Sequence, residues 1–496
     1  MAEFNVVGKK ENKTENKTEP TTIKFTNSQK VAVNGIMNFI SQPFDVNKYI
    51  IGLVGPGGTG KTFIIDYIIT YCKLSPSTIK CTSTTHKACR VFSEAICGRK
   101  VDTIQSTFGL RLDLKLEDFN PDNPQFNPSS KPKLDNIQLL IIDEASMLPA
   151  KLTTYVCKVC KELQIKILMI GDDNQLAPVN EVRSIAFDRC FILYKLTEIV
   201  RQGEMNPILN LLNMLRYDIA NKSFTFIEYI SKHIGEMKYN DIEEGYSILG
   251  PQGFKNFIDI CFKDEAYQKN IDMYKIIAYT NLKVSSWNNY IRNSIIDNAN
   301  KSIITNNDLI LSYETIVNEF NETILNNSEE YIIKSIIDYT EDKHHLNGFL
   351  IQFQQIHGGR ITKPIFVVDH TDKDNISRYI NILDELKNRA LSATRANRVQ
   401  RWKDYYNFKK EHLLLTNIID RYTRTIKYTR DLDYGFALTS HKSQGSTYST
   451  VFVDLNDMIY DKNGFIYTNT NELLRRLYVA CSRAKTNLIM CYGNNG

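Results

Sequence analysis

The sequence predicts an α/β protein in which two units of parallel sheet are each flanked by helices. One observation is an apolar run of strand length, residues 49–54, followed by a glycine-rich loop and an apolar-periodic helix. A second is the buried-strand pattern Ile137–Ile142, which ends in two acidic residues. A third is a later alternation of strand and helix patterns, from residue 274 onward, that has no glycine-rich loop.

The glycine-rich loop has the sequence Gly55-Pro56-Gly57-Gly58-Thr59-Gly60-Lys61-Thr62. It is a phosphate-binding loop in the strand–loop–helix context that this pattern requires. The glycines let backbone N–H groups close on a polyphosphate, and the helix N-terminus adds partial positive charge. Lys61 can reach the β- and γ-phosphates, and Thr62 can hold Mg²⁺. We therefore predict a nucleoside triphosphate and Mg²⁺ as cofactors.

Polar residues follow the next two strands at the edge of the sheet where open α/β folds bind ligands. Asp143 can hold a Mg²⁺-bound water, and Glu144 can orient and deprotonate the attacking water. Gln175, after the predicted strand Ile165–Ile170, is in position to touch a γ-phosphate. Arg201 carries no signal of its own and is interpreted as a surface arginine.

The segments that flank these elements differ in composition. Residues 1–24 are polar and charged, which predicts a disordered arm. A helix is expected from Thr26 or Asn27, with Gln29 as a solvated residue of its first turn. Prolines and asparagines within residues 108–133 break any long element, so we expect a small insertion there, such as a hairpin.

The second unit is predicted from a strand at Tyr274–Tyr279 and strands at Thr450–Leu455 and Asn487–Cys491. A helix predicted over Glu472–Ala484 carries several arginines, among them Arg483. Because this unit has no phosphate loop, it cannot bind a nucleotide alone. It can lend arginines to the first unit.

Residues 296–432 separate the two halves of the second unit. Their first part is rich in strand patterns and predicts a small barrel, and the chain becomes helical from Tyr379. Between Lys387 and Arg430, twelve Lys or Arg stand against three acidic residues. The basic residues Arg398, Arg401 and Lys403 mix here with Trp402, Tyr405, Tyr406 and Phe408. This mixture suits contact with a nucleic-acid backbone and bases, and a solvated helical face is the alternative.

Composition identifies no partner by itself, because the net charge is only +5. Ten cysteines form no framework and the N-terminus has no signal-peptide pattern, so we expect reduced thiols and a cytoplasmic protein. No apolar run approaches the ~20 residues that span a bilayer, so no membrane partner is expected. Cys157 and Cys160 lack a second ligand pair, so a helical turn is favoured over a zinc or redox site.

Several further blocks accompany the phosphate loop and the acidic pair in a fixed order. They are Thr85-His86-Lys87, Thr103–Ser106, Gly171–Val179, the spaced set Ala278, Asn281, Val284, Asn288 and Arg292, Thr439–Gly445, and Leu477–Ala484. Together the blocks resemble superfamily 1 helicases, and specifically the RecD/Dda-like subgroup that moves 5′ to 3′ on single-stranded DNA. The resemblance covers roughly residues 25–496 and implies an ATP- and Mg²⁺-dependent DNA helicase with a role in DNA replication, repair or recombination.

The resemblance also implies roles for individual residues. Gln29 would read adenine, residues 55–62 would bind the phosphates, and Thr62 and Asp143 would hold the metal. The implied catalytic residues are Lys61, Glu144, Gln175, Arg201 at the γ-phosphate, and Arg483 as an arginine finger. The implied DNA contacts are Thr85, His86, Thr103, Ser106, Thr280, Asn281, His441 and Ser443. Gln105 stands where the family usually has His.

The same resemblance divides the chain into two RecA-like motor domains with insertions. The first domain would comprise residues 25–107 and 134–200, with a small insertion at 108–133 that acts as a wedge. The second would comprise residues 201–295 and 433–496, with an SH3-like barrel and a basic helical extension at 296–432. Expected partners are single-stranded DNA, junctions of single- and double-stranded DNA, and replication or recombination proteins, and the motor is expected to be monomeric.

Three alternatives stay open at this stage. An RNA-directed helicase is the nearest, because phosphate contacts do not distinguish the two sugars. A nucleotide-gated nucleic-acid-binding switch would use the same loop but hydrolyse slowly and unwind nothing. A small-molecule or nucleoside kinase would leave the second unit without a role. The direction of movement follows from the resemblance alone.

Overall fold

The computed structural model describes residues 24–110, 131–178, 181, 184–198, 206–296, 299–318, 322–356, 359–420, 423 and 425–493. Three sequence predictions lie outside these residues: the N-terminal arm up to residue 23, residues 111–130 of the small insertion, and Arg201. Among the described helices, none is both long enough and apolar enough to cross a bilayer.

The first unit is a six-stranded parallel sheet with the strand order β3-β2-β4-β5-β1-β6. Its strands are β1 (Ile50–Val54), β2 (Ile79–Ser83), β3 (Val101–Thr103), β4 (Leu139–Ile142), β5 (Lys166–Gly171) and β6 (Ile192–Lys195). Strands β1, β4 and β5 are buried along their whole length, as expected for a parallel sheet covered on both faces.

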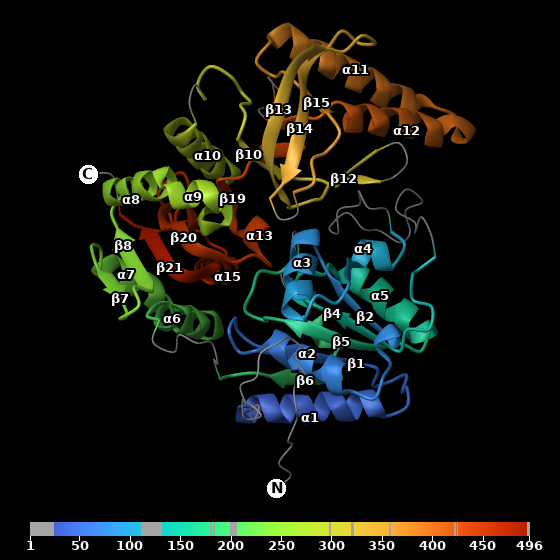
Figure 1. Ribbon diagram of the computed structural model, residues 1–496, viewed down its shortest axis with the longest axis vertical. Helices are drawn as coiled ribbons and strands as arrows, with labels where there is room; N and C mark the ends of the chain where they lie inside the picture. The colour runs from blue at the N-terminus through green and yellow to red at the C-terminus, as the bar shows by residue number, and fades with distance from the viewer. Residues whose placement is uncertain are drawn as a thin grey trace, which may run out of the picture.

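Helices cover both faces of this sheet (Figure 1). They are α1 (Asn27–Ser41), α2 (Lys61–Tyr71), α3 (His86–Ala95), α4 (Ile104–Thr107) and α5 (Ala150–Glu162). Helices α1, α2 and α3 contribute to one apolar cluster, whereas α4 and α5 contribute to another. Cys157 and Cys160 are buried on α5 within the second of these clusters.

The second unit has the strand order β19-β9-β20-β21-β8-β7, parallel except for the β7–β8 pair. Its strands are β7 (Met237–Tyr239), β8 (Gly245–Leu249), β9 (Tyr274–Ala278), β19 (Ala437–Thr439), β20 (Tyr448–Asp454) and β21 (Ala484–Cys491). Its helices are α6 (Ile208–Asn221), α7 (Thr225–Lys232), α8 (Pro251–Lys263), α9 (Glu265–Lys269), α10 (Asn281–Ile295), α13 (Ser440–Ser443), α14 (Leu455–Ile459) and α15 (Thr470–Cys481). Two chain segments far apart in sequence therefore build one sheet.

One predicted boundary in the second unit is wrong. The sequence predicts a helix over residues 472–484, but α15 ends at Cys481 and β21 begins at Ala484. Arg483 consequently lies in a two-residue turn between a helix and a strand. The apolar residues that follow pair with β20 and β8, and strand pairing overrides the helical periodicity there.

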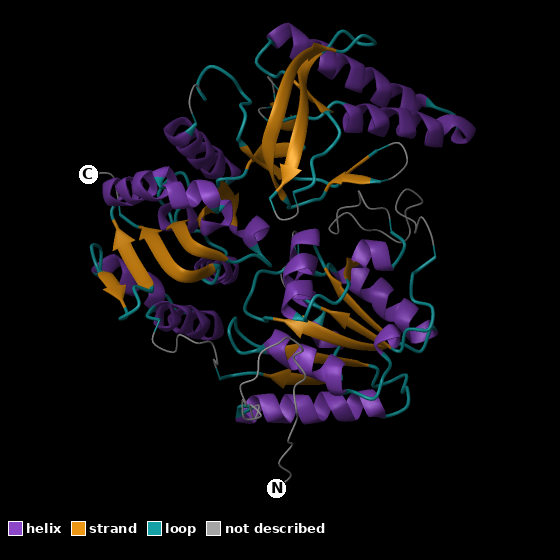
Figure 2. Cartoon of the chain, in the orientation of Figure 1, coloured by secondary structure: helices purple, strands orange, loops and turns teal. Residues whose placement is uncertain are grey.

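The insertion between the two halves is a five-stranded antiparallel sheet with the order β15-β14-β13-β10-β18. Its strands are β10 (Leu309–Ser312), β13 (Glu330–Thr340), β14 (Asn347–Gln355), β15 (Ile365–Val368) and β18 (Leu432–Tyr434). Two small hairpins accompany it, β11 (Ile316–Val317) with β12 (Thr323–Leu325) and β16 (Ile418–Ile419) with β17 (Ile426–Tyr428). Helices α11 (Lys373–Ser392) and α12 (Arg395–Glu411) lie side by side and extend away from these strands (Figure 2).

Candidate functional site

The loop after β1 has a shape that its own residues enforce. Gly58 and Gly60 have φ values of +82° and +80°, a region that glycine adopts without strain. A side chain at Gly55 would place a Cβ 2.8 Å from the carbonyl oxygen of Leu196, so that position requires glycine. The buried Thr59 donates its hydroxyl to the Pro56 carbonyl at 2.8 Å. The loop is therefore held in one conformation immediately before the N-terminus of α2.

Lys61 is the first residue of α2 and bends back over the loop. Its Nζ donates to the carbonyl oxygens of Gly55 at 2.6 Å and Pro56 at 3.0 Å. Carbonyl oxygens carry only partial charge, so a polyphosphate would compete well for this ammonium group. The first turn of α2 also presents backbone N–H groups, which favour an anion at this position.

Gln29 is buried, whereas the residues alone indicated a solvated surface glutamine. Its Oε1 accepts from the Thr26 N–H, and the Thr26 hydroxyl accepts from the Gln29 N–H, which completes a capping box at the start of α1. Its Nε2 donates to the Thr59 carbonyl at 3.0 Å. Gln29 thus connects α1 directly to the loop.

Asp143 and Glu144 follow β4 in the same unit. Glu144 has a φ of +52°, a left-handed conformation that costs a non-glycine residue on the order of 1 kcal/mol. Burial raises the pKa of both carboxyl groups; Glu144 raises that of Asp143 further, while Lys61 acts in the opposite direction. The Glu144 Oε2 atom is buried and has no hydrogen-bond partner among the described residues. Two adjacent, partly buried carboxyl groups with raised pKa values fit a site for a divalent cation and an attacking water.

Gln175 lies near the junction of the two units. Its Oε1 is also buried without a partner in the described part of the chain. Four hydrogen bonds between described residues join the units here. The Tyr478 hydroxyl donates to Asp172 at 2.7 Å, and Gln444 donates to the Leu176 carbonyl at 3.4 Å. Arg475 donates to the carbonyls of Asp173 at 2.5 Å and Gln175 at 2.9 Å. The segment after β5 in the first unit therefore contacts α15 and the turn after α13 in the second.

Arg483 belongs to the second unit, and its charge acts on the first. Its guanidinium donates to the carbonyls of Val479 at 3.0 Å and Ser446 at 3.1 Å. Its positive charge lowers the pKa of Glu144, although burial keeps that pKa raised. The charge of an arginine in one unit thus reaches a carboxyl group of the other. These groups together fit a Mg²⁺-bound nucleoside triphosphate. They are the glycine loop, the cations Lys61 and Arg483, and the side-chain oxygens of Glu144 and Gln175 that have no hydrogen-bond partner among the described residues.

The sequence predicted Arg475 only as one of the arginines that the second unit can lend to the first, and it predicted no role for Tyr478. Tyr478 lies inside the block 477–484 and Arg475 just before it, but neither has a sequence-local partner. Their partners, Asp172 and the Gln175 carbonyl, lie about three hundred residues away and are brought close only by the fold.

The residues predicted to contact DNA fall at helix starts in both units. Each of four threonines caps the helix that follows a strand. Thr85 accepts from the Ala88 N–H, Thr103 from Ser106, Thr280 from Lys283 and Thr439 from Lys442. In the first unit, Thr85 follows β2 and Thr103 is the last residue of the neighbouring β3. In the second unit, Thr280 follows β9 and Thr439 is the last residue of the neighbouring β19. Thr439 is a cap that the sequence-based assignment omitted.

The other predicted DNA contacts differ in their surroundings. Ser106 accepts from Lys133 Nζ at 3.2 Å, and Asn281 accepts from Arg430 at 3.2 Å. Ser443 is buried and donates to the Ser440 carbonyl at 2.8 Å, so its hydroxyl is directed into the protein. Burial lowers the pKa of both His86 and His441, which favours their neutral forms at pH 7.

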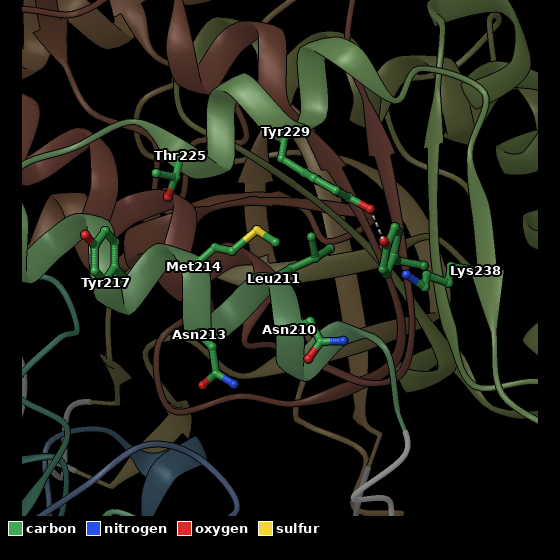
Figure 3. A pocket seen from close by; sticks show the side chains of 9 residues that line it. Asn210, Leu211, Asn213, Met214, Tyr217, Thr225, Tyr229 and Lys238 are labelled. Atoms are coloured by element: carbon green, nitrogen blue, oxygen red, sulfur yellow. Dashed lines mark hydrogen bonds between the residues drawn. The ribbon is translucent and has the colours of Figure 1, made fainter.

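A separate pocket of about 520 Å³ lies between α6, α7 and the β7–β8 pair (Figure 3). Leu211, Met214 and Tyr229 line it, and Tyr229 bonds to Tyr246 at 2.8 Å. Lys238 is the one charged residue among its described lining residues. The pocket contains none of the predicted site residues and lacks the cations that a triphosphate requires.

Family models match both ends of this framework. A model described as AAA domain matches residues 38–229, and one described as UvrD-like helicase C-terminal domain matches residues 434–491. The first match contains the phosphate loop and the acidic pair, and the second contains Arg483.

Three relatives extend the comparison. An uncharacterized protein of Acanthamoeba polyphaga mimivirus is 25% identical over 94% of this chain and 99% of its own length. The ATP-dependent DNA helicase dda of Enterobacteria phage T4 is 26% identical over 62% of this chain and 66% of its own length. A structure of two coordinating Pif1 helicases at forked double-stranded DNA is 16% identical, with a TM-score of 0.50, over 95% of this chain and 92% of that chain. This last likeness concerns the fold.

Proposed function

We propose that the chain is a superfamily 1 DNA helicase of the Pif1/Dda-like type, which uses Mg²⁺-ATP to move 5′ to 3′ along single-stranded DNA and separate duplexes. The observation that carries the proposal is the position of Arg483. It lies in the second unit, yet its charge acts on Glu144 in the first. Nucleotide chemistry assembled from two bodies is suited to producing movement between them.

The residues of the candidate site have different roles in the proposed hydrolysis. Bound Mg²⁺-ATP supplies a γ-phosphoryl group, whose transfer to water requires in-line attack and neutralisation of charge more than covalent chemistry. Lys61 and residues 55–60 would hold the phosphates, and Thr62 and Asp143 would hold the metal. Glu144 accepts the proton of the attacking water, and Gln175 orients it. Arg201 remains a prediction from the resemblance.

Arg483 supplies the link between hydrolysis and movement. An arginine finger contributes about 10³-fold or more to the rate, so hydrolysis requires the two units to be closed. In the present conformation its guanidinium donates to carbonyls of its own unit, so it must exchange at least one of these bonds to reach a phosphate. Each cycle of closing and opening would shift one unit relative to the other along the strand.

The DNA strand would cross both units at the capped helix starts. Thr85 and Thr103 provide one pair of contacts and Thr280 and His441 the other, with the remaining predicted DNA contacts beside them. In the first unit, backbone N–H groups at the starts of α3 and α4 would bind phosphate without reading bases, which suits a motor that works on any sequence. In the second unit Thr280 already donates its N–H and hydroxyl groups to Asp457, so the strand would pass beside that carboxylate. The neutral histidines would contribute as hydrogen-bonding groups rather than as cations.

The domain division proposed from the sequence fits these roles. Residues 25–107 with 134–200 form the nucleotide-binding motor domain, and residues 201–295 with 433–496 form the second. Residues 108–133 would act as the wedge, and residues 296–432 would carry an additional DNA-binding surface on α12. The proposed partners are single-stranded DNA and its junctions with duplex, and the motor is proposed to act as a monomer.

Strand displacement on partial duplexes tests this function most broadly. Substrates with a 5′ overhang should be unwound in the presence of Mg²⁺ and ATP, and substrates with a 3′ overhang should not. Unwinding only from 3′ overhangs would contradict the direction, and no unwinding with either would contradict the helicase proposal. The same substrates with an RNA loading strand distinguish the RNA-directed alternative.

A further inference from the structure

Glu330 is a buried carboxylate at which three parts of the molecule meet. It is the first residue of β13, in the insertion, and its Oε1 accepts from Lys275 Nζ at 2.6 Å. Its Oε2 accepts from Lys87 Nζ at 3.0 Å. Lys275 lies on β9 of the second unit and Lys87 on α3 of the first. All three side chains are buried, so one carboxylate pairs with a cation from each motor unit.

Tyr448 of β20 completes this junction. Its ring centroid is 4.8 Å from Lys87 Nζ and 5.3 Å from Lys275 Nζ, and Lys87 also donates to its hydroxyl at 3.1 Å. Lys275 donates further to the Gly435 carbonyl at 2.7 Å. The two ammonium groups therefore have hydrogen-bond acceptors and an aromatic face in place of water.

A second ion pair lies beside the first. Arg90 Nη1 donates to Glu329 Oε2 at 2.7 Å. Lys87 and Arg90 are three residues apart on α3 and so share one helix face, opposite the consecutive carboxylates Glu329 and Glu330. Two paired contacts fix both the position and the rotation of α3 against the insertion.

The junction lies directly beside the first proposed DNA contact. Lys87 is in the first turn of α3, which begins at His86 and is capped by Thr85. Burial alone would raise the pKa of Glu330, but Lys275 and Lys87 outweigh this effect and hold the pKa at about 2. The carboxylate is therefore ionised at any working pH, and moving the insertion would pull Lys87 and the Thr85–His86 turn with it.

We propose that Glu330 is a positioning residue that couples the DNA-contacting turn at Thr85 and His86 to the second motor unit. This inference rests on the proposed function, because it assigns the residue a part in DNA-stimulated hydrolysis. Glu330 contacts neither nucleotide nor DNA in this scheme. Glu330 transmits the position of the DNA strand on the first unit to β9 of the second unit. Thr280 and Asn281 directly follow β9, so the coupling extends to the closure of the two units around the nucleotide.

The test measures ATP hydrolysis by the full chain at increasing concentrations of an oligothymidylate, with and without the substitution Glu330→Gln. The wild type should be stimulated. In Glu330→Gln, the DNA-free rate and the KM for ATP should stay within about twofold, while the stimulated kcat falls about tenfold, the loss expected for a charge-assisted hydrogen bond. Glu330→Asp should recover part of the stimulation, because the charge is retained.

Two further variants keep the result interpretable. Glu329→Gln alters the adjacent pair, which is partly exposed, and should reduce stimulation in the same direction but less. Asp308→Asn removes a buried carboxylate that pairs with Arg292 outside the first unit, and should lower thermal stability without uncoupling DNA from hydrolysis. If Glu330→Gln does not fold, the DNA stimulation of ATP hydrolysis is compared between Glu329→Gln and the wild type instead.

The outcomes separate the two proposals. A wild type that DNA does not stimulate would contradict the proposed function itself. A stimulated wild type with both Glu330→Gln and Glu329→Gln stimulated equally would overturn the positioning role alone. Equal loss of stimulation in Asp308→Asn would also overturn it, because the effect would then be general destabilisation.

Discussion

The two motor units use the same strand–turn–helix geometry in opposite ways. After β1 the chain forms a glycine loop, and the N-terminus of α2 is available to an anion from solution. After β9 the corresponding turn is filled by the carboxylate of Asp457, which accepts from the N–H groups of Tyr279 at 2.7 Å and Thr280 at 2.8 Å and from the Thr280 hydroxyl at 2.7 Å. The second unit thus occupies its own anion-binding position.

This difference explains why related sheets carry different chemistry. The first unit keeps a helix N-terminus, a lysine and two carboxyl groups for a ligand. The second unit satisfies its helix N-terminus internally and presents Arg483 from the short turn between α15 and β21. The fold supplies the strand ends, and the turn residues decide whether each end binds a nucleotide or supports the other unit.

The largest expected effect comes from removing the chemistry of the first unit. Lys61→Ala or Glu144→Gln should reduce ATP turnover by about 10³-fold or more, because the phosphates lose a counter-charge or the water loses its base. Steady-state hydrolysis with saturating DNA measures this. Near-normal turnover in either variant would show that the site is wrongly assigned to the first unit.

Removing the contribution of the second unit should be nearly as severe. Arg483→Ala should lower turnover by about 10³-fold while single-stranded DNA binding stays largely intact. Anisotropy of a labelled oligonucleotide provides the binding measurement. A parallel loss of DNA affinity would instead make Arg483 a strand contact.

Asp457→Ala tests the second unit, in which a side chain of the protein itself occupies the turn after β9. The substitution leaves two backbone N–H groups and a hydroxyl without their acceptor, so the free energy of unfolding should fall by about 2 kcal/mol. Nucleotide affinity should not change, because the second unit binds none. Denaturant unfolding and nucleotide titration check both statements, and weakened ATP binding would mean that the two units are not separable in this way.

The basic surface on α12 should have a smaller effect. Arg401 pairs with Asp404 at 3.5 Å on the same helix, so its charge is partly compensated. The sequence analysis grouped Arg398, Arg401 and Lys403 as equivalent basic residues, whereas the structure sets Arg401 apart. Arg398→Ala with Lys403→Ala should weaken DNA affinity several-fold and flatten its salt dependence by about two units of slope, about one for each lost phosphate contact. Arg401→Ala is the matched control and should do less. An unchanged slope would make α12 a solvated face.

The smallest effect concerns pH. Asp143 and Glu144 have raised pKa values in the folded protein, so without a bound cation the folded state retains protons that the unfolded chain releases. The free energy of unfolding of the nucleotide-free protein should therefore fall as pH rises above the ordinary carboxyl range. Stabilisation by Mg²⁺-nucleotide should be larger at pH 8 than at pH 6 in thermal unfolding. An equal stabilisation at both values would contradict the shared burial of the pair.

What the sequence could predict was local chemistry. The loop at residues 55–62 and the acidic pair 143–144 are consecutive residues with one plausible use. Periodicity also predicted strands β1, β4 and β5 of the first sheet and β9, β20 and β21 of the second, but not β3, β6, β7 or β8. The burial of Gln29 was missed because its partner, the Thr59 carbonyl, lies on another element. The junction at Glu330 and the Tyr478–Asp172 bond were missed for the same reason: neither partner is marked by its neighbours in sequence.

The central claim is that the nucleotide site is complete only when the second unit contributes Arg483. The most direct measurement compares the affinity for ADP with aluminium fluoride, which imitates the transition state, with the affinity for ADP alone, in the wild type and in Arg483→Ala. The account predicts that Arg483→Ala binds ADP normally but loses most of the additional affinity for the aluminium fluoride complex. Equal additional affinity in both proteins would contradict it.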